Sequence, residues 1–299
     1  MLPTETNLAP PIRHPIALEF TGERYVPEQK GSVELEHMHR YALAKKLASG
    51  KRVLDLACGE GYGSSQLSEV AASVTGIDVD SQAIAHAQTR YQKANLQFIS
   101  ASATSLPVGD QSFDLVVSFE TIEHLIHQDE MLAEIRRVMA ADGILLISSP
   151  NKLNYSDANN YSNPFHVKEL YREDFEHLLR KYFNFVALAG QRIAYGSLIL
   201  PDHHAKHAPT PTMHTIAIDE FNSIYDIAIA SNTNDVMLTA SFLERDVGQS
   251  ELVVQLVDRV RSLEMELADT YASQSWRITA PLRWGLYYLI RFMSSRRNK

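Results

Sequence analysis

Hydrophobic and polar positions alternate regularly between about residues 50 and 230. Short apolar runs typical of buried strands alternate with stretches in which apolar residues recur every three or four positions. The strand-like runs are Arg52–Leu56, Ser73–Ile77, Leu96–Ser100, Phe113–Ser118, Gly143–Ser148, Phe185–Ala189 and Tyr225–Ala230. The helical patterns are 33–49, Gly63–Ala71, Ser81–Ala94, Gln128–Met139 and Lys168–Lys181. This order predicts an α/β domain with a mostly parallel sheet and helices on both faces.

Two features interrupt the alternation. Gly143 stands between a helical pattern and the next strand, where glycine is the usual residue for ending a helix in a left-handed conformation. The segment 201–215 holds three prolines and four histidines, His203, His204, His207 and His214. Their spacing matches no fixed metal-binding pattern, so we expect an irregular polar insertion that covers the acceptor site.

Beyond residue 245 the pattern changes. Apolar residues follow a 3,4 spacing through Val253, Leu256, Val260, Leu263, Leu267 and Thr270. This spacing suits either a short coiled coil that joins two copies of the chain or a helix packed on the main domain. We therefore expect a flexible arm over 1–20, a main domain over 21–244 and a helical tail over 245–299.

Charge and cysteine content narrow the class of protein. The 299 residues carry a net charge of -8, so no overall basic field attracts nucleic acid. Cys58 is the only cysteine, which excludes an internal disulfide and favours a cytoplasmic protein. The tail from Arg277 to Lys299 is different, because it holds six basic residues and no acid. Its aromatic and arginine content over 276–293 suits a helix at the inner face of a membrane, a packed helix, or a docking segment for a partner protein.

A glycine-rich loop follows the first strand. The strand VLDLA leads directly into Gly59-Glu60-Gly61-Tyr62-Gly63, where glycines permit sharp turns and close approach of a ligand. A dinucleotide site requires a glycine where this chain has Ser64. The loop region also carries acids, Asp55 and Glu60, which suit the ammonium and sulfonium groups of S-adenosylmethionine. Asp78 ends the second strand, where an acid can accept both ribose hydroxyls.

In this order, the motifs VLDLACGEGYGS, VTGIDVD, LPVGDQSFDLVVSFETIEHL and EIRRVMAADGILLISSPN resemble those of class I S-adenosylmethionine-dependent methyltransferases. The resemblance implies a Rossmann-like sheet of seven strands whose final strand inserts antiparallel. It also implies an adenine contact after the third strand, where Ser102 replaces the usual aspartate and the Ala103 backbone can serve. The expected cofactor residues are Asp55, Ala57, Gly59, Gly61, Asp78, Val79, Ser102, Ala103 and Glu120.

A second cluster follows the fourth strand. Glu120, Glu123 and His124 lie three and four residues apart, so a turn or helix start places them on one face. His124 can act as a general base oriented by a carboxylate. Alternatively, the three residues bind a divalent metal that lowers the pKa of the acceptor hydroxyl. The ExxEH spacing resembles ubiquinone-pathway O-methyltransferases and small-RNA 2′-O-methyltransferases, and the resemblance to the RNA enzymes implies His166 as a fourth ligand. Oxygen-rich ligation with one or two histidines suits magnesium or manganese better than zinc.

Residues before the first strand are candidates for covering the cofactor. Tyr25 is expected near the donor, and Arg40 is expected to pair with the donor carboxylate. The alternative is that both residues pack the first helix.

The acceptor class follows from a second resemblance. The segments GERYVPE, ELEHMHRYALA, SPNKLNYSD and NPFHVKELYREDF resemble the methyltransferase domain of bacterial polysaccharide enzymes, including the chain-terminating enzymes of O-antigen synthesis. The tail segment SWRITAPLR resembles a C-terminal sequence of bacterial glycosyltransferases and their partners. Together they imply O-methylation of a sugar hydroxyl on a surface glycan or its lipid-linked precursor, with a glycosyltransferase as a partner. The rivals are a quinone or phenol methyltransferase and a non-catalytic cofactor-binding scaffold.

Overall fold

The structure, a computed structural model, describes residues 32–194, 222–233 and 251–279, with the short stretches 237–238, 240–241, 243 and 281–283. The chain divides into two compact units, with the boundary between Leu243 and Glu244. Several expectations lie outside the described residues: the arm 1–20, Tyr25, the insertion 201–215 and the segment 284–293. Within the described ranges, every helix is too short or too polar to cross a lipid bilayer.

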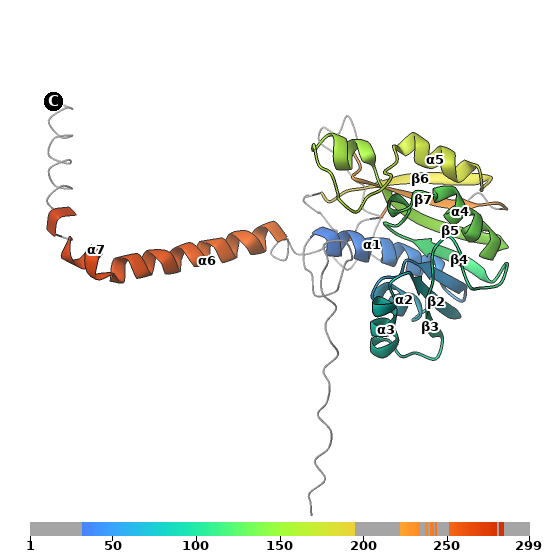
Figure 1. The fold of residues 1–299 in the computed structure, drawn as a ribbon, viewed down its shortest axis with the longest axis horizontal. Helices are drawn as coiled ribbons and strands as arrows, with labels where there is room; N and C mark the ends of the chain where they lie inside the picture. Colours follow the sequence, from blue (N-terminus) through green and yellow to red (C-terminus); the bar gives the residue numbers. More distant parts are fainter. Residues whose placement is uncertain are drawn as a thin grey trace, which may run out of the picture. The chain divides into compact units, whose positions relative to one another are not determined.

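The first unit is built on one seven-stranded sheet (Figure 1). Its strands are β1 Arg52–Leu56, β2 Ser73–Asp78, β3 Leu96–Ser100, β4 Phe113–Ser118, β5 Met139–Pro150, β6 Phe185–Gln191 and β7 Tyr225–Ser231. The strand order is β3-β2-β1-β4-β5-β7-β6, and β7 alone runs antiparallel to both of its neighbours. The Rossmann-like α/β fold with an antiparallel inserted strand is therefore confirmed.

Helices cover both faces of the sheet. They are α1 Ser32–Leu47, α2 Tyr62–Leu67, α3 Ser81–Arg90, α4 Gln128–Val138 and α5 Arg172–Arg180, with short turns η1 Ile122–His124 and η2 Leu153–Asp157. Apolar side chains of α1 and α2 pack with Val53, whereas those of α4 and α5 pack with Leu54 and Leu56. This division follows from the two-residue period of β1, which sends alternate side chains to opposite faces.

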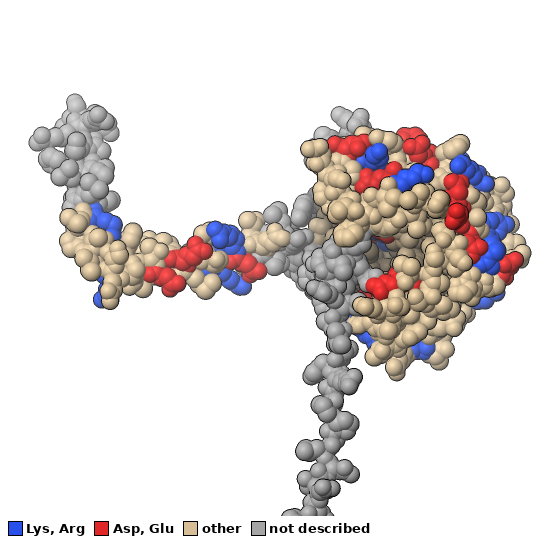
Figure 2. Space-filling model, in the orientation of Figure 1, with Lys and Arg blue, Asp and Glu red and all other residues tan. Residues whose placement is uncertain are grey.

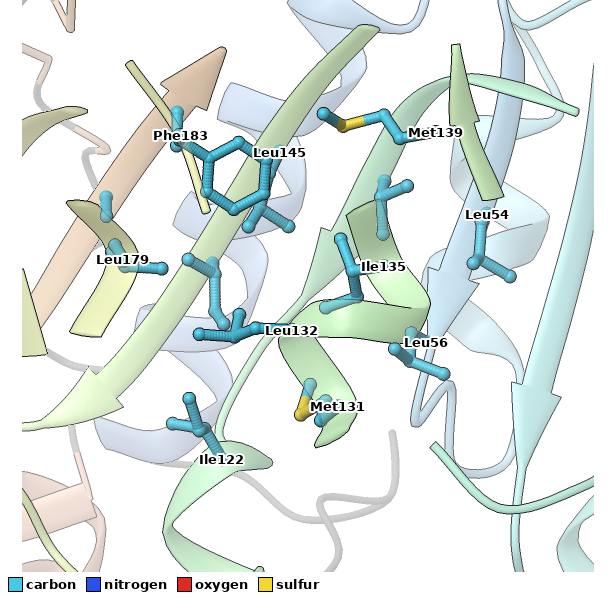
Figure 3. Packing of buried hydrophobic residues seen from close by; sticks show 14 of the residues in the cluster. Leu54, Leu56, Ile122, Met131, Leu132, Ile135, Met139, Leu145, Leu179 and Phe183 are labelled. Atoms are coloured by element: carbon cyan, nitrogen blue, oxygen red, sulfur yellow. The ribbon is translucent and has the colours of Figure 1, made fainter. Parts of the chain in front are cut away.

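The largest core lies under α4. Met131, Leu132 and Ile135 of α4 point toward Leu56 of β1 and Leu145 of β5 (Figure 3). All five side chains are buried. An apolar stripe with this spacing is what anchors an amphipathic helix to a sheet, and here it fixes the position of the η1 turn that precedes α4.

The prediction for Gly143 is wrong. Helix α4 ends at Val138, Met139 is already extended, and β5 includes Gly143. Met139 pairs with Phe113 but Ile144 pairs with Leu115, so β5 carries extra residues that shift its register on β4. A Cβ at Gly143 would lie 2.5 Å from Met139 Cγ. The glycine thus allows a close approach within an irregular strand and does not end the helix.

The second unit is helical. Helix α6 runs from Glu251 to Ala272 and is followed by α7, Gln274–Ile278, which Ser273 caps by accepting a hydrogen bond from the Trp276 backbone. The 3,4 spacing thus correctly predicted a helix.

Candidate active site

The functional residues gather at the carboxyl ends of β1, β2, β4 and β5. Because these strands are parallel, their carboxyl ends meet at one edge of the sheet. The glycine-rich loop follows β1, Asp78 ends β2, Glu120 and η1 follow β4, and Asn151 follows β5. In open α/β sheets this edge is where ligands bind.

The glycine-rich loop is tightly wound. Three of its residues, Ala57, Gly59 and Gly61, have positive φ angles of 61°, 57° and 91°. A Cβ at Gly61 would lie 2.8 Å from Ala87 Cβ and from the Phe98 ring. Both the backbone conformation and the lack of space therefore require glycine at position 61. The loop backbone therefore packs directly against α3 and β3.

Asp55 supports this loop from inside the domain. Its carboxylate accepts hydrogen bonds from Ser64 Oγ at 2.6 Å and from the Tyr41 hydroxyl at 3.1 Å. Burial raises the pKa of Asp55 to about 6. Gly63 makes this arrangement possible, since a Cβ there would lie 2.0 Å from the Tyr41 ring. Asp55 thus ties β1 to α1 and α2, a contact that sequence reasoning missed because Tyr41 precedes the motif.

Glu60 does not serve a ligand in this structure. Its carboxylate accepts a hydrogen bond from the Tyr91 hydroxyl at 2.8 Å and lies 3.2 Å from His86 Nε2, and the residue is buried. Both partners belong to α3 or directly follow it. The expectation that Glu60 faces the positive charge of the donor is therefore wrong, because its charge is directed to the packing of α3.

Asp78 links the two strands that hold the loop. Its Oδ2 accepts a hydrogen bond from the Gly59 backbone at 2.8 Å, and its Oδ1 accepts one from Asp80 at 2.9 Å. A carboxylate at the carboxyl end of the second strand is the group that accepts ribose hydroxyls in comparable α/β sheets. Next to it, the Val79 side chain is 75% exposed. This combination fits the ribose end of a nucleoside ligand.

Ser102, the expected adenine contact, hydrogen-bonds to Thr104 in its own turn. Ser102 Oγ shares a hydrogen bond with Thr104 Oγ1 at 2.9 Å and accepts one from the Thr104 backbone at 3.2 Å. Ala103 is partly buried against the core. Ser102 therefore shapes its own turn, and its hydroxyl has one remaining hydrogen-bonding position, donor or acceptor, for a ligand.

On the reaction side, Glu120 is held by a buried arginine. Glu120 has a φ of 51°, its Oε1 accepts a hydrogen bond from Ser148 Oγ at 2.5 Å, and Arg40 Nη1 lies 3.3 Å from the same oxygen. Arg40 is 1% exposed, donates from Nε to Gln191 Oε1 at 2.7 Å, and stacks 4.3 Å from the Tyr225 ring centre. Among the described residues Arg40 Nη2 is buried and has no hydrogen-bond partner.

A second buried acid lies beside this pair. Burial, opposed by the charge of Arg40 and aided by that of Glu120, raises the pKa of Glu36 to about 7. Burial likewise raises the pKa of Tyr225, which hydrogen-bonds to Glu36. Glu36, Gln191, Ser148 and Tyr225 were all missed by sequence reasoning, because each becomes part of the site only through packing of α1, β5, β6 and β7.

The structure brings Glu123, His124 and His166 together. Candidate ligand atoms of the three lie within 4.8 Å of one another. Two backbone hydrogen bonds join the segments that carry them: Glu123 O accepts from Val167 and from Lys168, each at 2.9 Å. The His124 and His166 rings meet edge to face, with centres 5.0 Å apart. Residues 42 positions apart in the chain thus share one small volume.

Both imidazoles are oriented by neighbours. His124 Nδ1 lies 3.1 Å from the Phe165 carbonyl oxygen, and His166 Nδ1 lies 2.5 Å from Glu169 Oε1. If each Nδ1 carries the proton, each Nε2 carries a lone pair, as in most metal-binding histidines. His124 Nε2 lies 3.8 Å from Glu123 Oε1, whereas the lone pair of His166 Nε2 accepts a hydrogen bond from Asn163 Nδ2 at 3.0 Å, which a metal ion would have to displace. The arrangement therefore supports either a base at His124 or a metal ligand set.

Glu120 is not part of this cluster, because Ser148 and Arg40 hold its carboxylate. The predicted four-ligand set is thus reduced to two imidazoles and one carboxylate. Such a set suits zinc or iron as well as magnesium or manganese. Without Glu120 as a second carboxylate, the ligand set no longer favours magnesium or manganese over zinc.

On the visible face of the described residues, acidic and basic side chains are interspersed, without an extended basic surface (Figure 2).

Comparison with known proteins gives the following matches. Residues 54–147 match a family model described as a methyltransferase domain. The chain is 36% identical over 171 residues to a "probable S-adenosylmethionine-dependent methyltransferase" of Mycolicibacterium smegmatis, covering 55% of this chain and 65% of that protein. It is 30% identical over 184 residues to a fatty-acid O-methyltransferase of the same organism, covering 60% and 61%.

A phthiotriol/phenolphthiotriol dimycocerosates methyltransferase of Mycobacterium ulcerans is 37% identical over 123 residues, covering 40% of this chain and 45% of that protein. Among solved structures, the PH0226 protein of Pyrococcus horikoshii is 19% identical, with a TM-score of 0.49, and covers 67% of this chain and 90% of that one. The chain spans just under two thirds of the length of the first relatives.

Proposed function

We propose that this chain, which carries a class I S-adenosylmethionine-dependent methyltransferase domain, methylates a sugar hydroxyl of a bacterial surface glycan or its lipid-linked precursor. The observation that carries the proposal is His124, an oriented imidazole next to a buried carboxylate at the carboxyl edge of the sheet. A hydroxyl is a poor nucleophile at neutral pH, and this pair is the described group best suited to remove its proton.

The cofactor side has residues for each part of the donor. Asp78 would accept the ribose hydroxyls, the backbone of the glycine-rich loop would contact the methionine portion, and Arg40 Nη2 would pair with its carboxylate. Ser102 and Ala103 would lie at the adenine. When bound, S-adenosylmethionine supplies a methyl group on a positively charged sulfur.

On the reaction side, His124 Nε2 would accept the proton of the acceptor hydroxyl. The oxygen then forms a bond to the methyl carbon as the carbon–sulfur bond breaks, and its electron pair stays on the sulfur. Glu123 would stabilise the imidazolium cation, since its Oε1 lies 3.8 Å from Nε2. In the alternative with a metal, Glu123, His124 and His166 would hold the ion, which would lower the pKa of the bound hydroxyl.

Polar groups on the described reaction side support a sugar acceptor. Asn163 and Tyr155 offer amide and hydroxyl partners beside His166. The resemblance to polysaccharide methyltransferases points the same way.

A second candidate is a lipid or small phenolic hydroxyl. Two of the relatives are named for fatty-acid and phthiotriol or phenolphthiotriol substrates. In addition, Phe165 and Val167, which flank His166, are 45% and 55% exposed. Such side chains can contact an acyl chain or an aromatic ring.

The decisive experiment incubates the full chain with methyl-labelled S-adenosylmethionine and three acceptor pools: lipid-linked glycans, fatty acids and simple phenols. Mass spectrometry then locates the label. A labelled sugar supports the proposal, and label confined to an acyl or phenolic oxygen supports the second candidate. Donor binding without any transfer would indicate a non-catalytic scaffold. Repeating the assay after chelation and dialysis tests the metal, because undiminished activity would leave His124 alone as the base.

A further inference from the structure

Helix α6 carries an apolar stripe that the described part of the chain leaves exposed. Leu256, Val260, Leu263 and Leu267 are 55%, 53%, 46% and 50% exposed. Their spacings of four, three and four residues place them on one side of the helix. Extended to Val253 and Thr270, this stripe covers most of the 22 residues of α6, and we call it the α6 seam. A seam of this length is an interaction surface for another helix.

The residue types in the α6 seam indicate how many helices it joins. In a heptad frame, Val253, Val260 and Leu267 occupy the a positions, and Leu256, Leu263 and Thr270 occupy the d positions. Branched Val at a with Leu at d favours two parallel strands. Two of the three a positions and two of the three d positions fit this rule.

The charges beside the α6 seam are complementary in the same arrangement. Arg259 occupies a g position and Glu264 the following e position, and both are exposed. In a parallel pair in register, g of one helix faces the next e of its partner, so Arg259 would meet Glu264 of the second copy twice by symmetry. Acidic and basic side chains both occur along α6 in Figure 2.

We propose that α6 pairs with α6 of a second copy of this chain as a parallel, in-register, two-stranded coiled coil. The proposal does not depend on the acceptor, because it concerns only the second compact unit. A seam of about three heptads is short, so the dimer is expected to dissociate within a measurable range of protein concentration.

Sedimentation equilibrium of the full chain tests the pairing. The wild type should show a monomer–dimer equilibrium, and Leu263→Lys should raise its dissociation constant at least about a hundredfold by placing charge in the seam. Met265→Lys is the matched control: Met265 is 65% exposed and lies two residues away at an f position outside the seam. It should leave the equilibrium unchanged. Both variants should still bind S-adenosylhomocysteine like the wild type.

A monomer at all concentrations, a trimer or tetramer, or a dimer that Leu263→Lys leaves intact would each overturn the proposal. Orientation is tested by cysteine cross-linking, which is clear in this chain because its single cysteine, Cys58, is buried. Leu256→Cys, near one end of the seam, should give a disulfide-linked dimer under mild oxidation, because only a parallel pair brings these two positions together. Asp258→Cys, at an exposed f position, should not. Equal cross-linking of the two variants would contradict the parallel register.

Discussion

The two sides of the active site are built in different ways. On the cofactor side, the glycine-rich loop and Asp78 come from one short stretch, Asp55–Asp78, in which two neighbouring parallel strands hold the loop. The reaction side collects residues from the turn after β4 and from the segment after β5. The first is fixed largely by backbone conformation, and the second by contacts between side chains far apart in the sequence. A substitution on one side should therefore impair only that side's function, either cofactor binding or methyl transfer.

The largest separate effect is expected at His124. His124→Ala should lower the turnover rate roughly 10²- to 10⁴-fold, because the proton acceptor is lost. Affinity for S-adenosylhomocysteine should stay unchanged. The rate is measured on the acceptor that the labelling experiment identifies. His127→Ala is the control, since His127 lies three residues later with a side chain that is 70% exposed. Equal losses in both variants would contradict a specific role for His124.

A backbone effect is expected on the cofactor side. Gly61→Ala should lower the free energy of unfolding by about 2–4 kcal/mol, from a positive φ and a 2.8 Å clash with Ala87 and Phe98. Gly50→Ala separates the two causes, because Gly50 has a φ of 68° but nothing within 4 Å of a new Cβ. It should cost about 1 kcal/mol. Chemical denaturation measures both, and equal costs would show that packing against the loop is loose.

The buried acid between the two sides gives a pH effect. The pKa of Glu36 is raised to about 7, so the folded state keeps this proton while the unfolded state loses it near pH 4.5. Stability from this group therefore falls as the pH rises from about 4.5 to 7. Glu36→Gln should become more stable relative to the wild type across this window, by no more than about 3 kcal/mol. Denaturation curves at several pH values measure the difference.

A constant difference across that window would mean that Glu36 has an ordinary pKa. The control is Glu130→Gln, which removes a carboxylate whose side chain is 62% exposed.

A smaller effect, on metal affinity, is expected from Glu169, which orients His166. Glu169→Gln removes the carboxylate that lies 2.5 Å from His166 Nδ1. If the site takes a metal, affinity for manganese or zinc should fall about 10- to 100-fold. Calorimetric titration of the metal alone measures it. If the wild type binds neither ion, the metal alternative is wrong; if both proteins bind equally, Glu169 does not orient the ligand.

Sequence reasoning was most successful where local pattern decides the structure. The strand positions and the meeting of the glycine-rich loop with the end of β2 follow from short motifs and parallel topology. The antiparallel final strand was implied by the family resemblance. It was wrong about Gly143, because the register shift between β4 and β5 depends on their pairing. It was also wrong about Glu60, because charge in a loop does not say which way a side chain points.

The reaction side was only partly predictable for the same reason. The spacing of Glu120, Glu123 and His124 is compatible with one face, but the structure sends Glu120 to Arg40 and Ser148 and the other two toward His166. Because Glu120 has a positive φ, its side chain points in a different direction from the side chains of η1. No pattern in the sequence reveals such a turn for a residue that is not glycine.

The most direct test of a two-sided site compares Asp78→Asn with His124→Ala. Calorimetric titration with S-adenosylhomocysteine measures cofactor affinity, and the labelled assay measures turnover. The account predicts that Asp78→Asn weakens cofactor binding at least about tenfold, whereas His124→Ala leaves it unchanged and abolishes most turnover. If His124→Ala weakened cofactor binding as much as Asp78→Asn, or if Asp78→Asn left binding intact, the division into a cofactor side and a reaction side would be contradicted.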